Sequence, residues 1–291
     1  MYEMSHKIFG QLYTYSDENF YGEFHLANKK LKNIQMKKYL LPMLISTTLF
    51  LPTMSFANDV YTITVYHFKD AQQEVVLDTY LQTAYLPALH RKNKKDIGVF
   101  KPIANDTATD KIIYVIIPFK SLDEIESLDK SLTGDSTYLL AGKDYLNASY
   151  QTPPYTRMEK IILTAFPLAP QMKLPQLHSD KKDHVYELRS YESPTEKYHI
   201  NKVKMFNEGG EIKIFTHINA NAVFYADVIA GSHMPNLMYL TSYENMEDRD
   251  AHWKSFSDDP DTKKLFAMDE YKNNVSKADI ILMRAASYSD Y

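Results

Sequence analysis

Two stretches of the chain repeat the same pattern of hydrophobic and polar positions. Residues 60–66 and 185–191 both combine β-branched and aromatic side chains at a two-residue period, which predicts a strand in each. Further along, residues 116–124 match residues 240–248 at a spacing of 124 positions. Because similarity at a fixed spacing is typical of duplicated architectures, the pattern predicts two tandem copies of one α+β unit.

The helix starts within this repeat carry related caps. Ser121 lies three positions before Glu124, which is the spacing of a capping box, and Asn245 lies three positions before Asp248. A side-chain oxygen at the first position accepts a hydrogen bond from a backbone N–H of the first turn. Both places therefore predict a helix that directly follows a strand.

The same periods predict an element order for each copy. In the first copy we expect strands at 60–68, 97–103, 111–119 and 157–166, and helices at 72–91, from 121 and at 136–147. In the second copy we expect strands at 185–191, 211–217, 222–229, 236–243 and 280–286, and helices at 195–207, at 246–257 and from 259. The strands at 211–217 and 222–229 are expected to form a hairpin.

This order, β-α-β-β-α-β with additions, is typical of a ferredoxin-like unit, whose sheet has helices on one face only. Two such units packed sheet to sheet would cover each other's bare face. The predicted fold class is therefore α+β: two ferredoxin-like (βαββαβ) domains forming an intrachain dimeric α+β barrel. Pairing with a copy in another chain is the alternative, but a tethered partner has the higher effective concentration.

The N-terminal region has the pattern of a targeting segment. A basic start at 36–38, an uncharged apolar run at 39–50 and a small-x-small site at 55–57 predict a signal peptide over 36–57. A transmembrane anchor is the alternative, although prolines interrupt the run. We interpret residues 1–35 as a mis-assigned extension, with Met36 rather than Met1 as the start. We expect export, periplasmic or secreted, after cleavage near Ala57, with no stable membrane span afterwards.

The composition of the remaining chain indicates its domain boundaries and excludes several kinds of partner and chemistry. We expect a first barrel domain at 58–166, a Pro-rich linker at 167–183 that is extended and semi-rigid, and a second barrel domain at 184–291. The 33 Lys and Arg against 37 Asp and Glu offer no basic footprint, so we expect no nucleic-acid partner. The absence of cysteine excludes disulfides, thiolate catalysis and thiolate metal sites.

The opening strand of the second copy carries the sharpest candidate residues. Strand alternation places Glu187, Arg189 and Tyr191 on one face, which we expect to line the barrel interior, while Tyr186 and Leu188 face the helices. A carboxylate and a guanidinium two positions apart could bind a polar ligand group. The alternative is that they pair with each other as a structural contact, since buried polar groups must be satisfied in any case.

Three further residues complete the candidate ligand-binding face. They are His217, on the expected hairpin, and the strand tyrosines Tyr225 and Tyr66, whose rings would suit an apolar or aromatic ligand. Each also has a plain structural interpretation as a half-buried or hydrogen-bonded residue. No catalytic set and no metal-ligand spacing is recognisable in the sequence, so we expect no catalytic residue, no metal and no cofactor.

The second copy resembles a known family in several segments together. The strand Tyr186–Tyr191, the strand-to-helix junction 240–248 and the run His252–Phe256 resemble the NIPSNAP family over roughly 185–285. The first copy resembles it more faintly, because it has no Trp and lacks the Glu and Arg of the opening strand. The resemblance implies the dimeric α+β barrel fold, but it implies no reaction, because the activity of the family is poorly defined.

These patterns favour a binding module over an enzyme. We expect an exported NIPSNAP-family protein that binds an unknown small molecule or protein through the barrel interior. It would be a pseudo-dimer within one chain, and further homo-oligomer formation stays open. The alternative is an oxidoreductase, monooxygenase-like or haem-degrading-like enzyme, which rests on fold analogy; a purely structural interaction module is the third. Convergence of His217, Glu187 and Arg189 would favour the enzyme. A fully packed barrel together with no ligand-induced melting shift would count against the binding module, and filled barrels with a large apolar outer patch would favour the structural module.

Overall fold

The structure is a computed structural model that describes residues 58–291. The upstream extension and signal peptide expected at 1–35 and 36–57 lie outside the described residues. The strands are β1 (Val60–Phe68), β2 (Gly98–Pro102), β3 (Lys111–Phe119), β4 (Arg157–Ala165), β5 (Val185–Glu192), β6 (Asn221–Ala230), β7 (Asn236–Tyr243) and β8 (Lys277–Ala285). The helices are α1 (Ala71–Tyr80), α2 (Leu86–Arg91), α3 (Leu122–Thr133), α4 (Ser136–Ala141), α5 (Lys143–Leu146), α6 (Glu196–Asn207), α7 (Glu211–His217), α8 (Met246–Asp258) and α9 (Pro260–Ala267).

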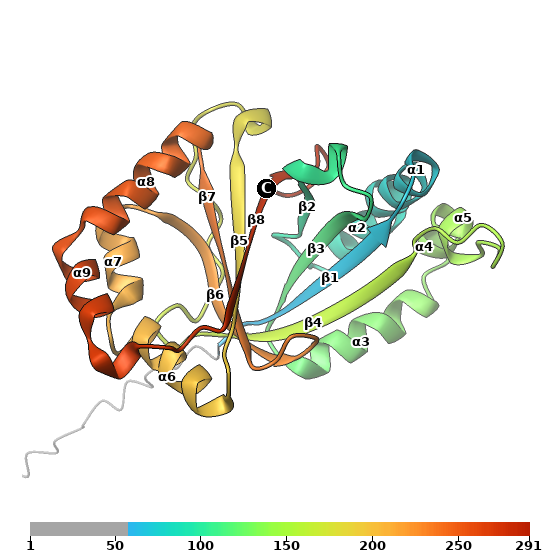
Figure 1. The fold of residues 1–291 in the computed structure, drawn as a ribbon. Helices are drawn as coiled ribbons and strands as arrows, with labels where there is room; N and C mark the ends of the chain where they lie inside the picture. Colours follow the sequence, from blue (N-terminus) through green and yellow to red (C-terminus); the bar gives the residue numbers. More distant parts are fainter. Residues whose placement is uncertain (1–57) are drawn as a thin grey trace, which may run out of the picture. The chain divides into compact units, whose positions relative to one another are not determined.

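The strands of residues 58–291 close into one antiparallel barrel in the order β1-β3-β2-β8-β5-β7-β6-β4 (Figure 1). The first half keeps the order β2-β3-β1-β4 and the second half the order β8-β5-β7-β6, and each is the order of a ferredoxin-like unit. The halves join at two seams, β2 with β8 and β4 with β6. The predicted fold class is confirmed, with both units in one chain.

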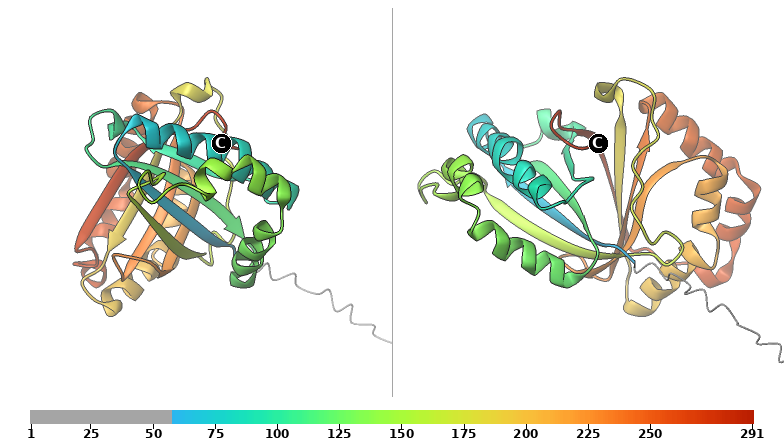
Figure 2. Two further views of the ribbon diagram at one scale, coloured as in Figure 1. Left: turned by 90° about the vertical axis from the view of Figure 1, so that its right-hand side faces the viewer. Right: turned by 180° about the vertical axis from the view of Figure 1, so that it is seen from behind.

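Helices cover the outer face of each half of the barrel. Helices α1 to α5 lie over the first half-sheet and α6 to α9 over the second, as the views in Figure 2 show. Buried side chains accordingly form three apolar clusters: one under the helices of the first half, one inside the barrel and one under the helices of the second half. The central parts of β1, β3, β5 and β7 are therefore buried on both faces, whereas in β8 only Met283 is buried.

The barrel interior is occupied by apolar side chains from both halves. The rings of Tyr61 and Phe224 lie 5.0 Å apart, and those of Phe100 and Tyr186 lie 4.8 Å apart. The C-terminal Tyr291 adds its ring 5.2 Å from that of Phe100. The interior is therefore a hydrophobic core shared by the two halves rather than a polar chamber.

The two faces of the opening strands are the reverse of those expected. Tyr186 and Leu188 belong to the barrel cluster, whereas Glu187 bonds to side chains of α8 and thus faces the helices, together with Arg189 and Tyr191. Alternation separates the two faces of a strand, but it does not say which face meets the helices when both are buried. Placing these residues in the barrel interior was wrong.

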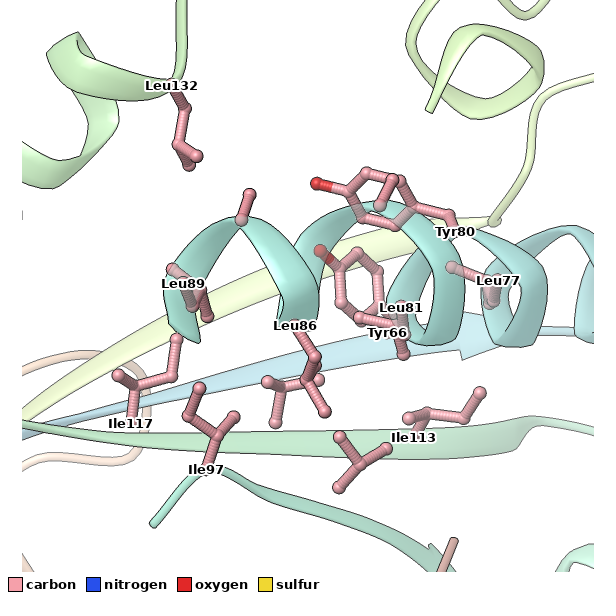
Figure 3. Packing of buried hydrophobic residues seen from close by; sticks show 14 of the residues in the cluster. Tyr66, Leu77, Tyr80, Leu81, Leu86, Leu89, Ile97, Ile113, Ile117 and Leu132 are labelled. Carbon is pink, nitrogen blue, oxygen red and sulfur yellow. The ribbon is translucent and has the colours of Figure 1, made fainter. Parts of the chain in front are cut away.

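The same correction applies to the two strand tyrosines. Tyr66 packs in the helix-side cluster of the first half, where Figure 3 shows it between β1 and the helix that carries Tyr80. Tyr225 packs in the helix-side cluster of the second half. Both are buried, at 5% and 4% exposure, so neither phenol lines the inside of the barrel.

The segment expected as a hairpin strand at 211–217 is the helix α7. Gly210 precedes it with φ 94°, a left-handed conformation that suits glycine and turns the chain between α6 and α7. Ile212 and Phe215 are three positions apart and both buried, which is helical rather than strand spacing. The correction removes His217 from the sheet.

The helix expected at 72–91 is continuous but widens in the middle. A π-helical segment, Leu81–Tyr85, joins α1 to α2, and the N–H of Leu86 bonds to the carbonyl of Leu81 five residues back. Pro87 follows directly and has no N–H to donate, while its ring crowds the carbonyl four residues before it. The wide turn accommodates that ring.

The linker lies along the β4–β6 seam in an extended form. The N–H of Phe166 donates to the carbonyl of Tyr225 at 2.9 Å, and the N–H of Lys173 donates to the carbonyl of Val223 at 2.9 Å. At the other seam, the C-terminal tail follows β8 and bonds to β2, with the N–H of Ala286 donating to the carbonyl of Val99 at 2.8 Å. The linker, which follows β4, thus covers the β4–β6 seam, and the C-terminal tail, which follows β8, covers the β2–β8 seam.

Candidate functional site

The predicted site residues lie in three separate places. Glu187, Arg189 and Tyr191 form one network under α8, and Tyr225 lies close to that network under α7. Tyr66 belongs to the first half, on the far side of the barrel. His217 is exposed at the C-terminal end of α7 and does not converge with Glu187 or Arg189.

Glu187 is the centre of the network and is completely buried. Its Oε1 accepts from Nε of Arg189 at 2.5 Å, and its Oε2 accepts from Nε of Arg249 at 2.6 Å and from Nε1 of Trp253 at 3.0 Å. The last two donors come from α8, so the carboxylate ties that helix to β5. A buried carboxylate with two guanidinium partners and an indole donor is fully satisfied.

Aromatic side chains extend the network through Arg189. Its Nη1 donates to the hydroxyl of Tyr191 at 2.9 Å, and that hydroxyl lies 2.9 Å from the hydroxyl of Tyr239. The guanidinium lies over the ring of Trp253 at 3.5 Å from its centre, a cation–π geometry. Burial lowers the pKa of Arg189, but Tyr239, Tyr191 and Glu187 outweigh it and raise that pKa, so the guanidinium stays charged.

Sequence reasoning missed Arg249 and Tyr239 as members of this network. Arg249 lies four positions before Trp253 on α8, so the two side chains share one helix face. That spacing is the one signal in the sequence that links Arg249 to the indole of Trp253. Nothing in the sequence joins either residue to Glu187, more than 50 positions away.

A hollow of about 310 Å³ lies beside the network, at the β4–β6 seam. We call it the seam hollow. It lies where β4 no longer pairs with β6: β4 pairs only from Ala226 onward, so the stretch from Asn221 to Tyr225 meets the linker on this edge, while its other edge pairs with β7. Its lining comes from the linker, α7 and β6, and includes Leu168, Leu174, Ile212, Thr216, Asn219, Asn221, Ala222, Phe224 and Tyr225.

The seam hollow has one charged lining residue, Lys173, and no lining carboxylate. Tyr225 connects it to the charged network, because its ring stacks on that of Tyr239 at 5.7 Å with an interplanar angle of 27°. Burial raises the pKa of both phenols well above the ordinary value, so both are neutral. The hollow thus offers aromatic and apolar walls, side-chain amides and a single cation.

The first half carries a cluster of tyrosines instead of charged groups. The rings of Tyr80 and Tyr145 stack at 3.8 Å and 8°, and the hydroxyls of Tyr80 and Tyr138 lie 2.9 Å apart. The full cluster is Tyr66, Tyr80, Tyr85, Tyr138, Tyr145 and Tyr155. Burial raises the pKa of Tyr66, Tyr80 and Tyr145, so these groups are neutral phenols.

Within residues 58–291, no three His, Cys, Asp or Glu side chains are grouped as a metal ion requires. None of the helices in this part of the chain combines the length and the apolar character needed to cross a membrane.

The second half of the barrel matches a sequence family. Residues 186–290 match the model of the NIPSNAP family. This half of the barrel is a NIPSNAP domain. It contains β5 to β8 and α6 to α9, and therefore the whole Glu187 network; the resemblance expected for this copy is confirmed. The first half lies outside the matched residues.

Solved structures resemble the barrel as a whole. A candidate monooxygenase from Lactobacillus acidophilus NCFM is 12% identical, covers 78% of this chain and 94% of its own, and has a TM-score of 0.52. A candidate monooxygenase from Fusobacterium nucleatum is 7% identical, covers 79% and 93%, and also has a TM-score of 0.52. At these identities the likeness concerns the fold.

A third solved structure is similar to part of the chain. A NIPSNAP family protein from Agrobacterium tumefaciens strain C58 is 15% identical and covers 40% of this chain and 98% of its own, with a TM-score of 0.34. No curated protein matches the chain in sequence.

Proposed function

We propose that this protein is a small-molecule binding module whose NIPSNAP domain holds the ligand in the seam hollow. The supporting observation is the hollow itself, since its volume of about 310 Å³ lies within the range of small-molecule sites, about 300–1,000 Å³. The barrel interior, where the sequence led us to expect the ligand, is occupied by apolar side chains. The candidate residue Tyr225 lines the seam hollow and keeps its proposed role there.

The proposed ligand is a small molecule with an apolar body and one carboxylate. Lys173 is the single charged lining residue, so an anionic group gains an attraction that no lining carboxylate opposes. Tyr225 and Ile212 offer aromatic and aliphatic contact to the body of the ligand. Asn219 and Asn221 bring amide groups to the rim, which can bond to either a carboxylate or an amide.

Titration calorimetry of the full chain tests this site. We expect aromatic and medium-chain carboxylates to bind, and Lys173→Gln to remove their preference over the matching amides. Thr216→Phe fills the hollow from an exposed position of α7 and should abolish binding. Thr133→Phe is the matched control, because Thr133 is also an exposed helical threonine whose hydroxyl bonds to a preceding carbonyl. Undiminished binding by Thr216→Phe, or no binding by any compound, would overturn the proposal.

An oxygenase is the second candidate function. The solved structures with a TM-score of 0.52 are described as candidate monooxygenases, and the first half carries a buried tyrosine cluster beside a π-helical segment. Against it, His217, Glu187 and Arg189 do not converge. Oxygen uptake during incubation with electron-rich phenols tests this candidate. Uptake that is lost in Tyr80→Phe but kept in Tyr198→Phe, an exposed tyrosine, would favour the enzyme.

We also propose that the chain is exported and that its mature form begins at Asn58. The basic start, apolar run and small-x-small site at 36–57 support the proposal. N-terminal sequencing of the protein isolated from its native cell is the test. Asn58 as the first residue is the expected result, and an intact Met1 or Met36 would contradict it.

A further inference from the structure

Two hollows adjoin along one side of α1, in the half of the barrel that lies outside the NIPSNAP match. One has a volume of about 150 Å³ and lies between α1 and α4–α5; we call it the aromatic hollow. The other has a volume of about 260 Å³ and lies between the start of α1 and the loop at 148–154; we call it the polar hollow. Val76 and Asp144 line both, and Figure 1 shows α1 beside α5.

The aromatic hollow has the size and lining of a site for one six-membered ring. Tyr80 and Tyr145, whose rings stack at 3.8 Å, form part of its wall, and Val75 and Val76 of α1 form another part. Burial raises the pKa of both phenols, so they add no charge. An apolar cavity of about 150 Å³ is large enough to bind benzene in another protein. The only charged residue in the lining is Asp144.

The polar hollow presents charges of opposite sign. Lys69 lies at the start of α1, and Asp144 lies where the two hollows meet. Both are exposed, and neither takes part in an ion pair within residues 58–291. Asp70 also lines this hollow, but its Oδ1 accepts from the N–H of Gln73 at 2.9 Å as the cap of α1.

The side chain of Gln73 holds the walls of the polar hollow in place. Its Nε2 donates to the carbonyl of Pro153 at 2.9 Å, and its Oε1 accepts from the N–H of Lys69 at 3.0 Å. The side chain is buried at 6% exposure. It therefore ties the loop at 148–154 to the start of α1 and fixes the walls between which a ligand would lie.

We propose that these two hollows together bind a free aromatic α-amino acid. The ring occupies the aromatic hollow, the ammonium group pairs with Asp144, and the carboxylate pairs with Lys69. The order of chemical groups along the two hollows supports this choice of ligand. The aromatic hollow has the size of a ring, the carboxylate of Asp144 lies where the two hollows meet, and the cation of Lys69 lies in the polar hollow. In an aromatic amino acid, one methylene separates the ring from the carbon that bears both charges. The site is independent of the seam hollow.

Titration calorimetry of the full chain with three ligands tests the assignment of the charges, in the Thr216→Phe background so that the seam hollow is closed to aromatic carboxylates. L-phenylalanine has both charged groups, phenethylamine lacks the carboxylate, and 3-phenylpropionate lacks the ammonium. We expect phenylalanine to bind most tightly, with each deletion weakening binding about fivefold, which is the upper range for an exposed ion pair. Asp144→Asn should weaken phenylalanine and phenethylamine about fivefold and leave 3-phenylpropionate unchanged, and Lys69→Gln should weaken phenylalanine and 3-phenylpropionate instead.

Matched variants separate binding at this site from a general effect of the substitutions. Asp123→Asn removes an exposed acid from the first turn of α3, as Asp144→Asn does from α5, and should bind phenylalanine like the parent protein. Ala141→Trp fills the aromatic hollow from an exposed position and should abolish binding, with an unchanged melting temperature as the check on folding. Thr216→Phe, which fills the seam hollow, should leave phenylalanine binding intact and so keeps the two proposals distinguishable.

Three results would overturn the inference. They are the absence of phenylalanine binding at millimolar concentration, equal affinity for phenylalanine and glycine, and equal weakening of all three ligands by Asp144→Asn. The last result would mean that the carboxylate supports the fold of α5 rather than the ammonium group.

Discussion

Glu187 shows how much one residue can organise in this protein. It is completely buried, yet its carboxylate bonds to Arg189 of its own strand and to Arg249 and Trp253 of α8. A buried charge is costly unless it is paired, and removal of one partner leaves the others uncompensated. The stability of the NIPSNAP domain should therefore depend strongly on the charge of this one carboxylate.

Glu187→Gln is predicted to destabilise the protein strongly. The amide removes the charge that neutralises Arg189 and Arg249, and breaking such a buried pair costs about 3 kcal/mol of the free energy of unfolding. Glu126→Gln is the control, because the ion pair of Glu126 with Lys130 is exposed on both sides and should contribute at most about 1 kcal/mol. Urea unfolding of both variants measures the difference, and equal losses would contradict the prediction.

The sequence revealed part of this network but not its location. The pairing of Glu187 with Arg189, one of the two interpretations that the sequence allows, follows from their spacing of two on one strand face. The choice of face depended on which side of β5 meets α8, and both sides are buried in the structure, the α8 side with its charges paired. Arg249 and Tyr239 join the network only through tertiary contacts, which a single sequence does not record.

At the scale of elements, caps were more predictable than short buried segments. The side chains of Ser121 and Asn245 accept from the backbone of Glu124 and Asp248, as the spacing predicts. These contacts are local, so the sequence contains all the information that they need. The segment at 211–217 is too short for its period to separate strand from helix, and its identity as α7 depends on packing against α9 and β6.

Gly210→Ala is predicted to destabilise the protein by about 1 kcal/mol. A side chain at φ 94° is strained, and because nothing lies within 4 Å of the added Cβ, the cost would come from the backbone alone. Gly134→Ala is the matched control, since Gly134 has φ −99° and equally open surroundings. It should be neutral or slightly stabilising. Thermal unfolding distinguishes the two, and a neutral Gly210→Ala would show that the strain is absent.

The end of the linker is predicted to loosen in acid. Hydrogen bonds from Ser179 and from the N–H of His178 hold the pKa of Glu244 at about 2, below its ordinary 4.5. Because the folded-state pKa is depressed, the contribution of this contact is complete above about pH 4.5 and is lost as the pH falls toward 2.

Hydrogen exchange measures this loosening. Protection of the Ser179 amide, corrected for the intrinsic rate, should fall between pH 5 and pH 2.5. The Lys173 amide, which bonds to the carbonyl of Val223 and to no carboxylate, should keep its protection. If both amides lose protection equally, the change is global rather than local to Glu244.

At the scale of the whole described unit, the architecture followed from the order of elements. Two β-α-β-β-α-β halves leave one bare sheet face each, and the barrel closes because these faces cover each other within one chain. The position of the proposed binding site did not follow from that order. Large aromatic side chains from both halves meet at the centre, and the seam hollow that we propose as the ligand site lies at the margin, where β4 stops pairing with β6.

A crystal structure of the protein with its tightest-binding carboxylate would locate the binding site without intermediate assumptions. We predict the ligand in the seam hollow, with its carboxylate at Lys173 and its apolar body against Tyr225. A ligand inside the barrel, among Tyr61, Phe100 and Phe224, would contradict the proposed site.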